Sequence, residues 1–367
     1  MKITNIRFER ATLQLDPPFC PNWDPTPRRT FGATLTIVET DAGVIGYGAG
    51  DDMGGFDGYE KHFIGKNLFD IEEHVRTLET ITFHAGRYWP IEVAIWDAIG
   101  KAKHETVASL FGGAEDFIPA YASTGAIMSA PERAASAVAI RDAGFKAMKI
   151  RVPQTQLDLG IETLKLIREA VGSDLELMVD LNQAWRMPGD TRKSISVETA
   201  MKFVDAAVDY GVYWIEEPLP MEDLEGLRKL RGRGTRIAGG EMVRTIHEIN
   251  VLIENDALDV IQADVVLAAG MERSREIARR ANARGHVFTP HTWSNGYGLA
   301  ANLHVTAGIG GAPFIEFPYD PPTWTNERRD FLMEKPLTVG SDGLLHVPSG
   351  AGLGIEPNWS HFKKSVA

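Results

Sequence analysis

Three carboxylates follow three consecutive β-strand patterns, each at the point where the strand pattern ends. Asp180 closes the segment MVD, Glu216 closes YWIE, and Glu241 follows IAGG. Each separation is close to the length of one strand–helix unit, so the three side chains would meet at one end of a parallel sheet. Carboxylates that converge in this way repel one another unless a cation lies between them. Because the ligands are hard oxygens, with no cysteine or paired histidine among them, the pattern predicts a Mg²⁺ site rather than a zinc site.

An acid–base pair follows on the next strand patterns. IQAD places Asp264 at the end of one strand, FTPH places His291 at the end of the next, and FIEF places Glu316 on the last. A carboxylate that holds an imidazole orients the ring and raises its basicity, which suits general acid–base catalysis. A lone histidine is more often a structural residue, so this interpretation depends on Asp264 lying beside His291.

Two cations share one face of an earlier strand pattern. In AMKIRV, Lys149 and Arg151 alternate with Met148 and Ile150, so the cations lie on one face and the apolar side chains on the other. Pointing into the barrel, they would suit a carboxylate substrate beside the metal. A guanidinium keeps its proton at any working pH, so Arg151 is better suited to hold a carboxylate than to accept a proton. Whether Lys149 acts as a base stays open.

Two further residues are candidate contacts for a substrate. Asn182 lies two residues after Asp180 and would reach either the substrate or a structural hydrogen-bond partner. Trp23 lies in the proline-rich segment PPFCPNWDPTPRR, which has no periodicity and predicts a loop that could cover the site. Local packing is the alternative role for Trp23. Glu217, next to Glu216, would point to the opposite face of its strand and is interpreted as structural.

The elements that must position these residues form a repeat. Short apolar strands are expected at 118–123, 147–152, 176–182, 212–218, 236–241, 260–265, 286–291 and 314–318, with amphipathic helix patterns between most of them. Eight strands that alternate with helices over about 200 residues are typical of a (β/α)₈ barrel, whose active site lies at the carboxyl ends of the strands. Before the repeat, residues 1–50 predict strands and residues 70–110 predict helices.

Composition limits the classes of partner. The 367 residues include 38 Lys and Arg against 50 Asp and Glu, a net charge of −12. Nucleic-acid and anionic-membrane partners need a basic face, so neither is expected. No stretch has the apolar length of a membrane span, and the single cysteine excludes an internal disulfide. A reducing cytoplasm is the default location.

These residues together resemble the enolase superfamily, and within it the mandelate racemase subgroup. The resemblance spans essentially the whole chain, including PSGAGLGIE near the C-terminus. It implies an α/β fold, a modified (β/α)₇β TIM barrel at 116–320, with an α+β capping domain at 1–115 that is completed by residues 321–367. It implies that Glu316 hydrogen-bonds an enolate oxygen. By the same resemblance, Asp180, Glu216 and Glu241 are the Mg²⁺ ligands, and Asp264 and His291 form the catalytic dyad. It also implies a homo-oligomer.

One position departs from the subgroup and affects the choice of reaction. The second strand usually carries Lys-x-Lys, and here Arg151 replaces the second lysine. All reactions of the family begin by removing a proton α to a carboxylate, with the resulting charge stabilised by metal and hydrogen-bond donors.

The step after proton removal leaves three reactions open. Loss of a β-hydroxyl makes a dehydratase, return of the proton to the other face makes a racemase or epimerase, and ring opening makes a lactone cycloisomerase. A racemase or epimerase needs two bases, and Arg151 is a poor proton acceptor, so dehydration of an acid sugar is favoured. A non-catalytic, metal-stabilised barrel that serves as a binding protein is the alternative from another class, and the intact acid–base residues disfavour it.

Overall fold

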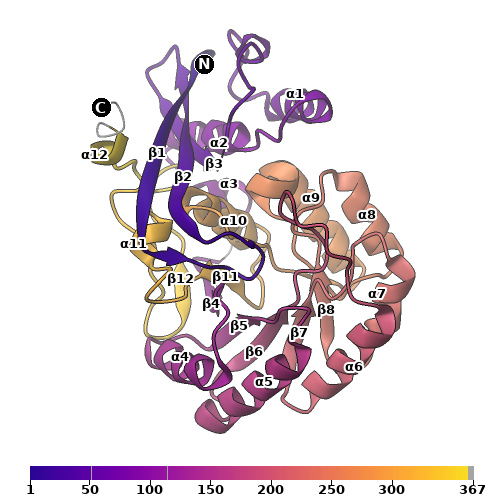
Figure 1. The fold of residues 1–367 in the computed structure, drawn as a ribbon. Helices are drawn as coiled ribbons and strands as arrows, with labels where there is room; N and C mark the ends of the chain where they lie inside the picture. Colours follow the sequence, from indigo (N-terminus) through magenta and orange to yellow (C-terminus); the bar gives the residue numbers. More distant parts are fainter. Residues whose placement is uncertain (51, 114, 363–367) are drawn as a thin grey trace.

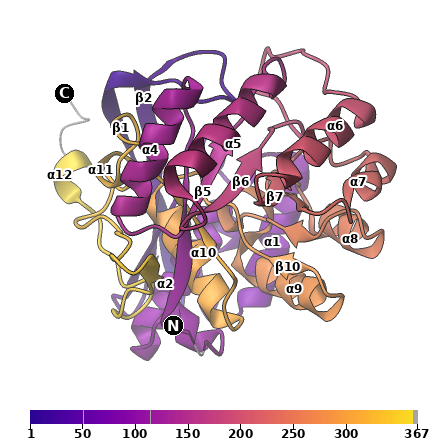
Figure 2. The same cartoon turned by 90° about the horizontal axis from the view of Figure 1, so that it is seen from below.

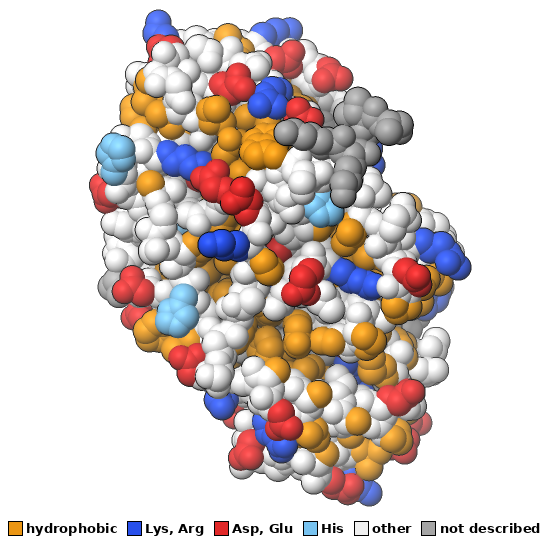
Figure 3. Space-filling model, turned by 90° about the vertical axis from the view of Figure 1, so that its left-hand side faces the viewer, with side chains coloured by type: hydrophobic (Ala, Val, Ile, Leu, Met, Phe, Trp, Pro, Cys, Tyr) orange, Lys and Arg blue, Asp and Glu red, His pale blue; other side chains and the backbone are white. Residues whose placement is uncertain are grey.

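The computed structural model describes residues 1–50, 52–113 and 115–362. An antiparallel sheet and its helices lie beside a ring of parallel strands, and the ring is covered on the outside by helices (Figure 1). Seen from below, helices α4, α5 and α6 lie side by side along the outer surface of strands β5 to β7 (Figure 2). On the face shown in Figure 3, acidic and basic side chains are interspersed. No helix of the described residues is both long and apolar enough to cross a membrane.

The capping region is a three-stranded antiparallel sheet in the order β1-β2-β3 with helices against it. Strand β3 packs closely on α2, and only glycine fits at the contact. A Cβ added at Gly46 would lie 1.9 Å from the carbonyl oxygen of Ala94. The elements are β1 (Ile3–Phe19), β2 (Arg28–Thr40), β3 (Ile45–Gly50), η1 (Glu60–His62), α1 (Ile71–His84), α2 (Pro90–Lys103) and α3 (Val107–Leu110).

The prediction of a loop across the proline-rich segment is wrong at both ends. Strand β1 continues through Pro17 and Pro18 to Phe19, which pairs with Arg28 at the start of β2. The reason is the position of β1 at the edge of its sheet, where a residue without a backbone N–H need not remove a ladder hydrogen bond. Trp23 therefore lies in a shorter connection than the sequence indicates.

Eight parallel strands form the barrel, and helices follow the first seven, which confirms the (β/α)₇β prediction. The last strand, β11, pairs with the first, β4; within the described residues no ladder joins β10 to β11. The strands are β4 (Phe117–Ser123), β5 (Ala147–Arg151), β6 (Glu176–Asp180), β7 (Val212–Glu216), β8 (Arg236–Gly239), β9 (Val260–Ile261), β10 (Val287–Phe288) and β11 (Ile315–Pro318). The helices are α4 (Ala130–Asp142), α5 (Leu157–Val171), α6 (Val197–Val208), α7 (Leu224–Leu230), α8 (Ile246–Glu254), η2 (Val265–Ala269), α9 (Gly270–Ala283) and α10 (Gly296–Gly308).

Strands β9 and β10 are shorter than the expected spans of 260–265 and 286–291. Each forms only two ladder pairs with its neighbour, and Asp264 lies beyond the end of β9. One oxygen of Asp264 accepts hydrogen bonds from the backbone N–H groups of Val266 and Leu267, so the chain turns into the π-helical segment η2 instead of continuing as a strand.

The C-terminal segment contacts both the barrel and the capping region. Gly352 exchanges backbone hydrogen bonds with Glu105 and Val107, and the Leu353 N–H donates to Asp97 at 2.8 Å. Strand β12 pairs antiparallel with β4. The remaining elements are α11 (Asn326–Arg329), β12 (Leu344–His346) and α12 (Trp359–Phe362).

A buried glutamate of the capping region holds the start of a barrel helix. Glu92 on α2 is fully buried and accepts from the backbone N–H groups of Met271 at 3.0 Å and Glu272 at 2.7 Å. Its neighbour Trp89 donates to the carbonyl oxygen of Ala268 at 3.0 Å. The segment that follows Asp264 is thus fixed by side chains from the other half of the molecule.

Replacing this glutamate should destabilise the fold. Glu92→Ala leaves two backbone N–H groups at the start of α9 without their acceptor and opens a cavity, so we expect a loss of about 2–4 kcal/mol. The midpoint of thermal or urea denaturation measures the change. Glu73→Ala is the control, because the Glu73–Lys66 pair is exposed and its removal should leave the midpoint unchanged. Equal midpoints for wild type and Glu92→Ala would show that the contact does not stabilise the fold.

Candidate active site

Three carboxylates meet at the carboxyl ends of neighbouring strands. Asp180 ends β6, Glu216 ends β7, and Glu241 lies two residues after β8. One oxygen of each lies within 4.8 Å of the others, and all three side chains are buried. The parallel pairing that places Asp180 opposite Glu216 explains how residues far apart in sequence share this point.

Glu216 is held by three donors. Lys149 donates to it at 2.6 Å, Gln262 at 2.8 Å, and the indole of Trp214 at 3.2 Å. Asp180 accepts the Asn182 N–H at 2.7 Å and pairs with the guanidinium of Arg151. Both carboxylates are therefore oriented by the protein itself.

Glu241 is the least satisfied of the three. Its Oε1 accepts from the indole of Trp185 at 2.7 Å, while Oε2 is buried and has no hydrogen-bond partner. Burial raises the pKa of Glu241, because a carboxylate without enough donors is unstable in a dry environment. The three carboxylates offer only oxygen ligands, and Oε2 of Glu241 has no hydrogen-bond partner in the protein. This donor set fits Mg²⁺, which prefers oxygen ligands.

Asp264 and His291 are hydrogen-bonded. Asp264 Oδ2 lies 2.9 Å from Nδ1 of His291, and its other oxygen is occupied by the turn of η2. The second ring nitrogen, Nε2, lies 3.5 Å from Oε2 of Glu241. Burial lowers the pKa of His291, but the charges of Glu241 and Glu316 and the hydrogen bond to Asp264 outweigh it and raise the pKa to about 9.

Glu316 lies within β11 and is surrounded by donors. It accepts from Ser123 Oγ at 2.7 Å and from the Thr292 N–H at 2.7 Å, and Lys149 Nζ lies 2.7 Å away. Burial raises its pKa, but the charges of Lys149, His291 and Arg151 outweigh this and lower the pKa to about 2. A carboxylate donates a hydrogen bond only when protonated. The role expected for Glu316, a donor to an enolate oxygen, therefore requires it to gain a proton when substrate is present.

Lys149 and Arg151 both point into the barrel. The ammonium group of Lys149 lies between Glu216 and Glu316 and is fully buried. Arg151 donates to the Thr124 carbonyl oxygen at 3.0 Å, and its guanidinium lies 4.7 Å from the ring centre of Trp23. Lys149 and Arg151 therefore share the inner face of β5, as the two-residue period of the sequence predicts.

A cavity of about 200 Å³ opens over this cluster, and both candidate substrate contacts line it. Asn182 has a positive φ of 47°, accepts from the Asn22 side chain at 3.2 Å, and has a buried amide nitrogen without a partner. The lining residues are Trp23, Arg28, Phe31, Arg151, Asn182, Trp185, Met187, Glu241, Met242, Leu267, His291, Trp293, Ser294 and Trp324.

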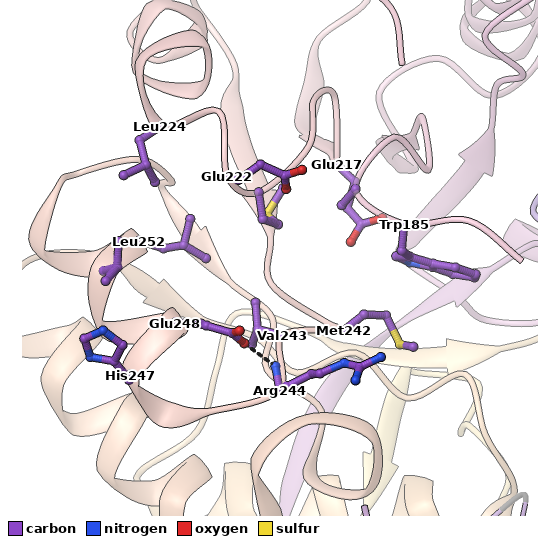
Figure 4. A pocket seen from close by; sticks show the side chains of 13 residues that line it. Trp185, Glu217, Glu222, Leu224, Met242, Val243, Arg244, His247, Glu248 and Leu252 are labelled. Atoms are coloured by element: carbon purple, nitrogen blue, oxygen red, sulfur yellow. Dashed lines mark hydrogen bonds between the residues drawn. The ribbon is translucent and has the colours of Figure 1, made fainter. Parts of the chain in front are cut away.

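A second cavity, of about 520 Å³, is lined by Trp185 and Met242, which also line the first (Figure 4). Glu217, interpreted as structural from the sequence, borders this cavity. It is buried, has a positive φ of 44°, and neither carboxylate oxygen has a partner. Arg244 lines the second cavity and is not among the residues that line the first.

Sequence reasoning missed the residues that orient the site. Trp185, Gln262, Ser123 and Thr292 hold Glu241, Glu216 and Glu316. None of them belongs to a spaced motif. Their only sequence signal is a polar or indole group within a few residues of a strand end.

A family model, curated relatives and a solved structure all match this chain. Residues 132–361 match the enolase C-terminal domain-like family. The chain is 28% identical to D-galactarolactone cycloisomerase of Agrobacterium fabrum, over 98% of this chain and 97% of that protein. It is 29% identical to L-rhamnonate dehydratase of Saccharopolyspora erythraea, over 90% of this chain and 86% of that protein. A crystal structure of a putative mandelate racemase from Bordetella bronchiseptica RB50, complexed with 2-oxoglutarate/phosphate, superimposes with a TM-score of 0.87 at 26% identity, covering 99% and 97% of the two chains.

The indole of Trp185 should matter for metal affinity. Trp185→Phe removes the donor that orients Glu241, so Mg²⁺ should bind about 10–100-fold more weakly to the metal-free protein, as measured by isothermal titration calorimetry. Trp23→Phe is the matched control, because Trp23 lines the same cavity but makes no hydrogen bond to a predicted ligand. If both variants bind Mg²⁺ as tightly as wild type, Trp185 does not position the ligand.

Proposed function

This chain belongs to the enolase superfamily, and we propose that it is a Mg²⁺-dependent enzyme that removes the proton α to the carboxylate of an acid sugar and eliminates water. The observation that carries the proposal is the meeting of two groups in one cavity. Three carboxylates form a cation site, and the Asp264–His291 pair presents a ring nitrogen 3.5 Å from one of them.

Each part of the site has a distinct task in this reaction. Mg²⁺ held by Asp180, Glu216 and Glu241 would stabilise the negative charge that develops on the substrate carboxylate. Arg151 orients that carboxylate through its planar fork of N–H groups. Nε2 of His291 accepts the α-proton or delivers a proton to the departing hydroxyl.

The position of Lys149 disfavours a two-base racemase or epimerase. Its ammonium group is fully buried between Glu216 and Glu316 and is not among the residues that line the cavity. Within the described residues that line the cavity, His291 is therefore the strongest candidate for a base. Return of a proton to the opposite face would need a second group there.

Lactone cycloisomerisation is the second candidate. D-galactarolactone cycloisomerase of Agrobacterium fabrum, which matches over nearly its whole length, is named for that reaction. The Saccharopolyspora erythraea relative is named a dehydratase. Both reactions need the same α-proton removal and differ in the oxygen that leaves. The intact donor set and dyad support an enzyme over a binding protein.

We also propose that the enzyme is a cytoplasmic homo-oligomer. A single, exposed cysteine suits a reducing compartment, and an acid-sugar substrate suits a metabolic enzyme. Symmetric assembly is common among soluble enzymes. Light scattering at micromolar concentration would measure the assembly, and fractionation of the source cells would measure the location.

The reaction is tested by proton exchange. In D₂O, the enzyme should exchange the α-proton of at least one acid in a library of acid sugars and their lactones, followed by NMR. Dehydration should also yield a 2-keto acid. Chelation should stop both reactions and added Mg²⁺ should restore them. Exchange that continues in metal-free buffer would contradict the metal site.

Replacing the histidine should separate chemistry from binding. His291→Asn should leave Mg²⁺ binding intact and lower kcat by about 10²–10⁴-fold, because the ring nitrogen that moves the proton is lost. Asp264→Asn should act in the same direction through the orientation of the ring. His286→Asn is the control, because His286 is buried outside the cavity lining. Wild-type kcat in His291→Asn would overturn the assignment of the base.

A further inference from the structure

We propose that the substrate carries a single carboxylate, and that its far end is a methyl, hydroxymethyl or ring carbon rather than a second carboxylate. This inference rests on the proposed function and names the class of acid sugar: an aldonate or anhydro-aldonate, not an aldarate. The relatives leave the choice open, because their names include both a rhamnonate and a galactarolactone.

The cations of the site are gathered at the reaction end. Arg151 lines the cavity and pairs with Asp180, whereas Lys149 is buried behind it between Glu216 and Glu316. A substrate carboxylate beside the predicted metal site therefore meets the guanidinium of Arg151. Neither cation lies where it could also serve a second carboxylate at the opposite end of the same molecule.

The rest of the cavity wall is mostly aromatic and aliphatic, and its polar members are Arg28, Asn182 and Ser294. Trp23 and Trp293 lie with ring centres 4.8 Å apart, Trp293 and Trp324 at 5.4 Å, and Phe31 and Trp324 at 5.0 Å. These rings come from the capping region, from the segment after β10 and from the C-terminal segment, and they form one packed cluster. The other apolar wall residues are Trp185, Met187, Met242 and Leu267.

Among the described residues, one further cation, Arg28, lines this cavity, and its Nε already donates to a carboxylate. Arg28 Nε donates to Asp24 Oδ2 at 2.9 Å, and the other oxygen of Asp24 accepts the Thr26 N–H at 2.9 Å. Asp24 is mostly buried, with 12% of its side chain exposed. A second substrate carboxylate would reach only the terminal N–H groups of Arg28, whose charge Asp24 already offsets. Arg244 lines the second cavity, where its side chain lies beside Met242 (Figure 4), and it is not among the residues that line this one.

The chemistry of this wall favours an uncharged end. The unpartnered donors of this wall, the indole N–H of Trp324 and the amide of Asn182, are neutral, so they suit a hydroxyl group. A carboxylate placed here would lose its hydration without a cation of its own to offset the charge, which is unfavourable. The C–H face of a sugar or a methyl group loses little hydration there and gains contact with the rings. The cavity volume of about 200 Å³ admits a small acid of this kind.

A matched series of substrates tests the inference. Within each stereochemical series, the 6-deoxyaldonate, the aldonate and the aldarate differ only at the far carbon, as methyl, hydroxymethyl and carboxylate. We expect kcat/KM for 2-keto acid formation to be at least tenfold higher for the better of the two monoacids than for the aldarate. An aldarate that reacts fastest would overturn the inference and leave the proposed function standing. No α-proton exchange with any member would instead contradict the proposed function.

A gain of charge in the wall gives a second, independent test. Met187→Arg adds a cation to the cavity lining, and Met187→Gln changes the same position without charge. The arginine variant should raise kcat/KM for the aldarate relative to the aldonate at least tenfold, and the glutamine variant should not. An unchanged ratio in the arginine variant would show that the far end of the substrate does not reach this wall.

Discussion

The mutual repulsion of three buried carboxylates is the constraint on which the site depends. Asp180, Glu216 and Glu241 lie at the ends of adjacent strands, and the barrel brings their oxygens within 4.8 Å. Lys149 and Arg151 offset the charge of the first two. Glu241 keeps a buried oxygen without any donor. Positive charge at the centre of such a cluster relieves the repulsion, and a divalent cation would supply it.

The same site depends on contacts between the two halves of the molecule. Glu92 and Trp89 of the capping region fix the start of α9 and the end of η2, and η2 begins at Asp264. Trp23, from the connection between β1 and β2, stacks over Arg151. The Asp264–His291 pair and Arg151 are therefore both held in part by residues outside the barrel. A shift of the capping region would disturb both at once.

The cavity has a charged end at the barrel strands and a mostly apolar wall opposite it. Charge is concentrated where the barrel strands end, because parallel strands deliver their carboxyl-terminal side chains to a single ring. The opposite wall is built from strand β2, loops and the C-terminal segment, whose rings pack on one another. The first end suits a reaction shared across the superfamily, and the second end suits selection among substrates.

The periodicity of the sequence was sufficient for the barrel and for the residues at its strand ends. Asp180, Glu216 and Glu241 were found because each ends an apolar strand of a regular repeat, and the face of Lys149 and Arg151 follows from the two-residue period of a strand. The roles of these residues remain predictions. Only the tertiary structure showed that Pro17 and Pro18 lie in an edge strand, and that Trp185 donates to a carboxylate 56 positions away. Strand and helix periods are local properties of the chain, whereas edge positions and loop-to-loop hydrogen bonds depend on which segments pack together. That packing also placed Arg28 against Asp24 and the rings against one another, and from this placement we infer which end of a substrate carries charge.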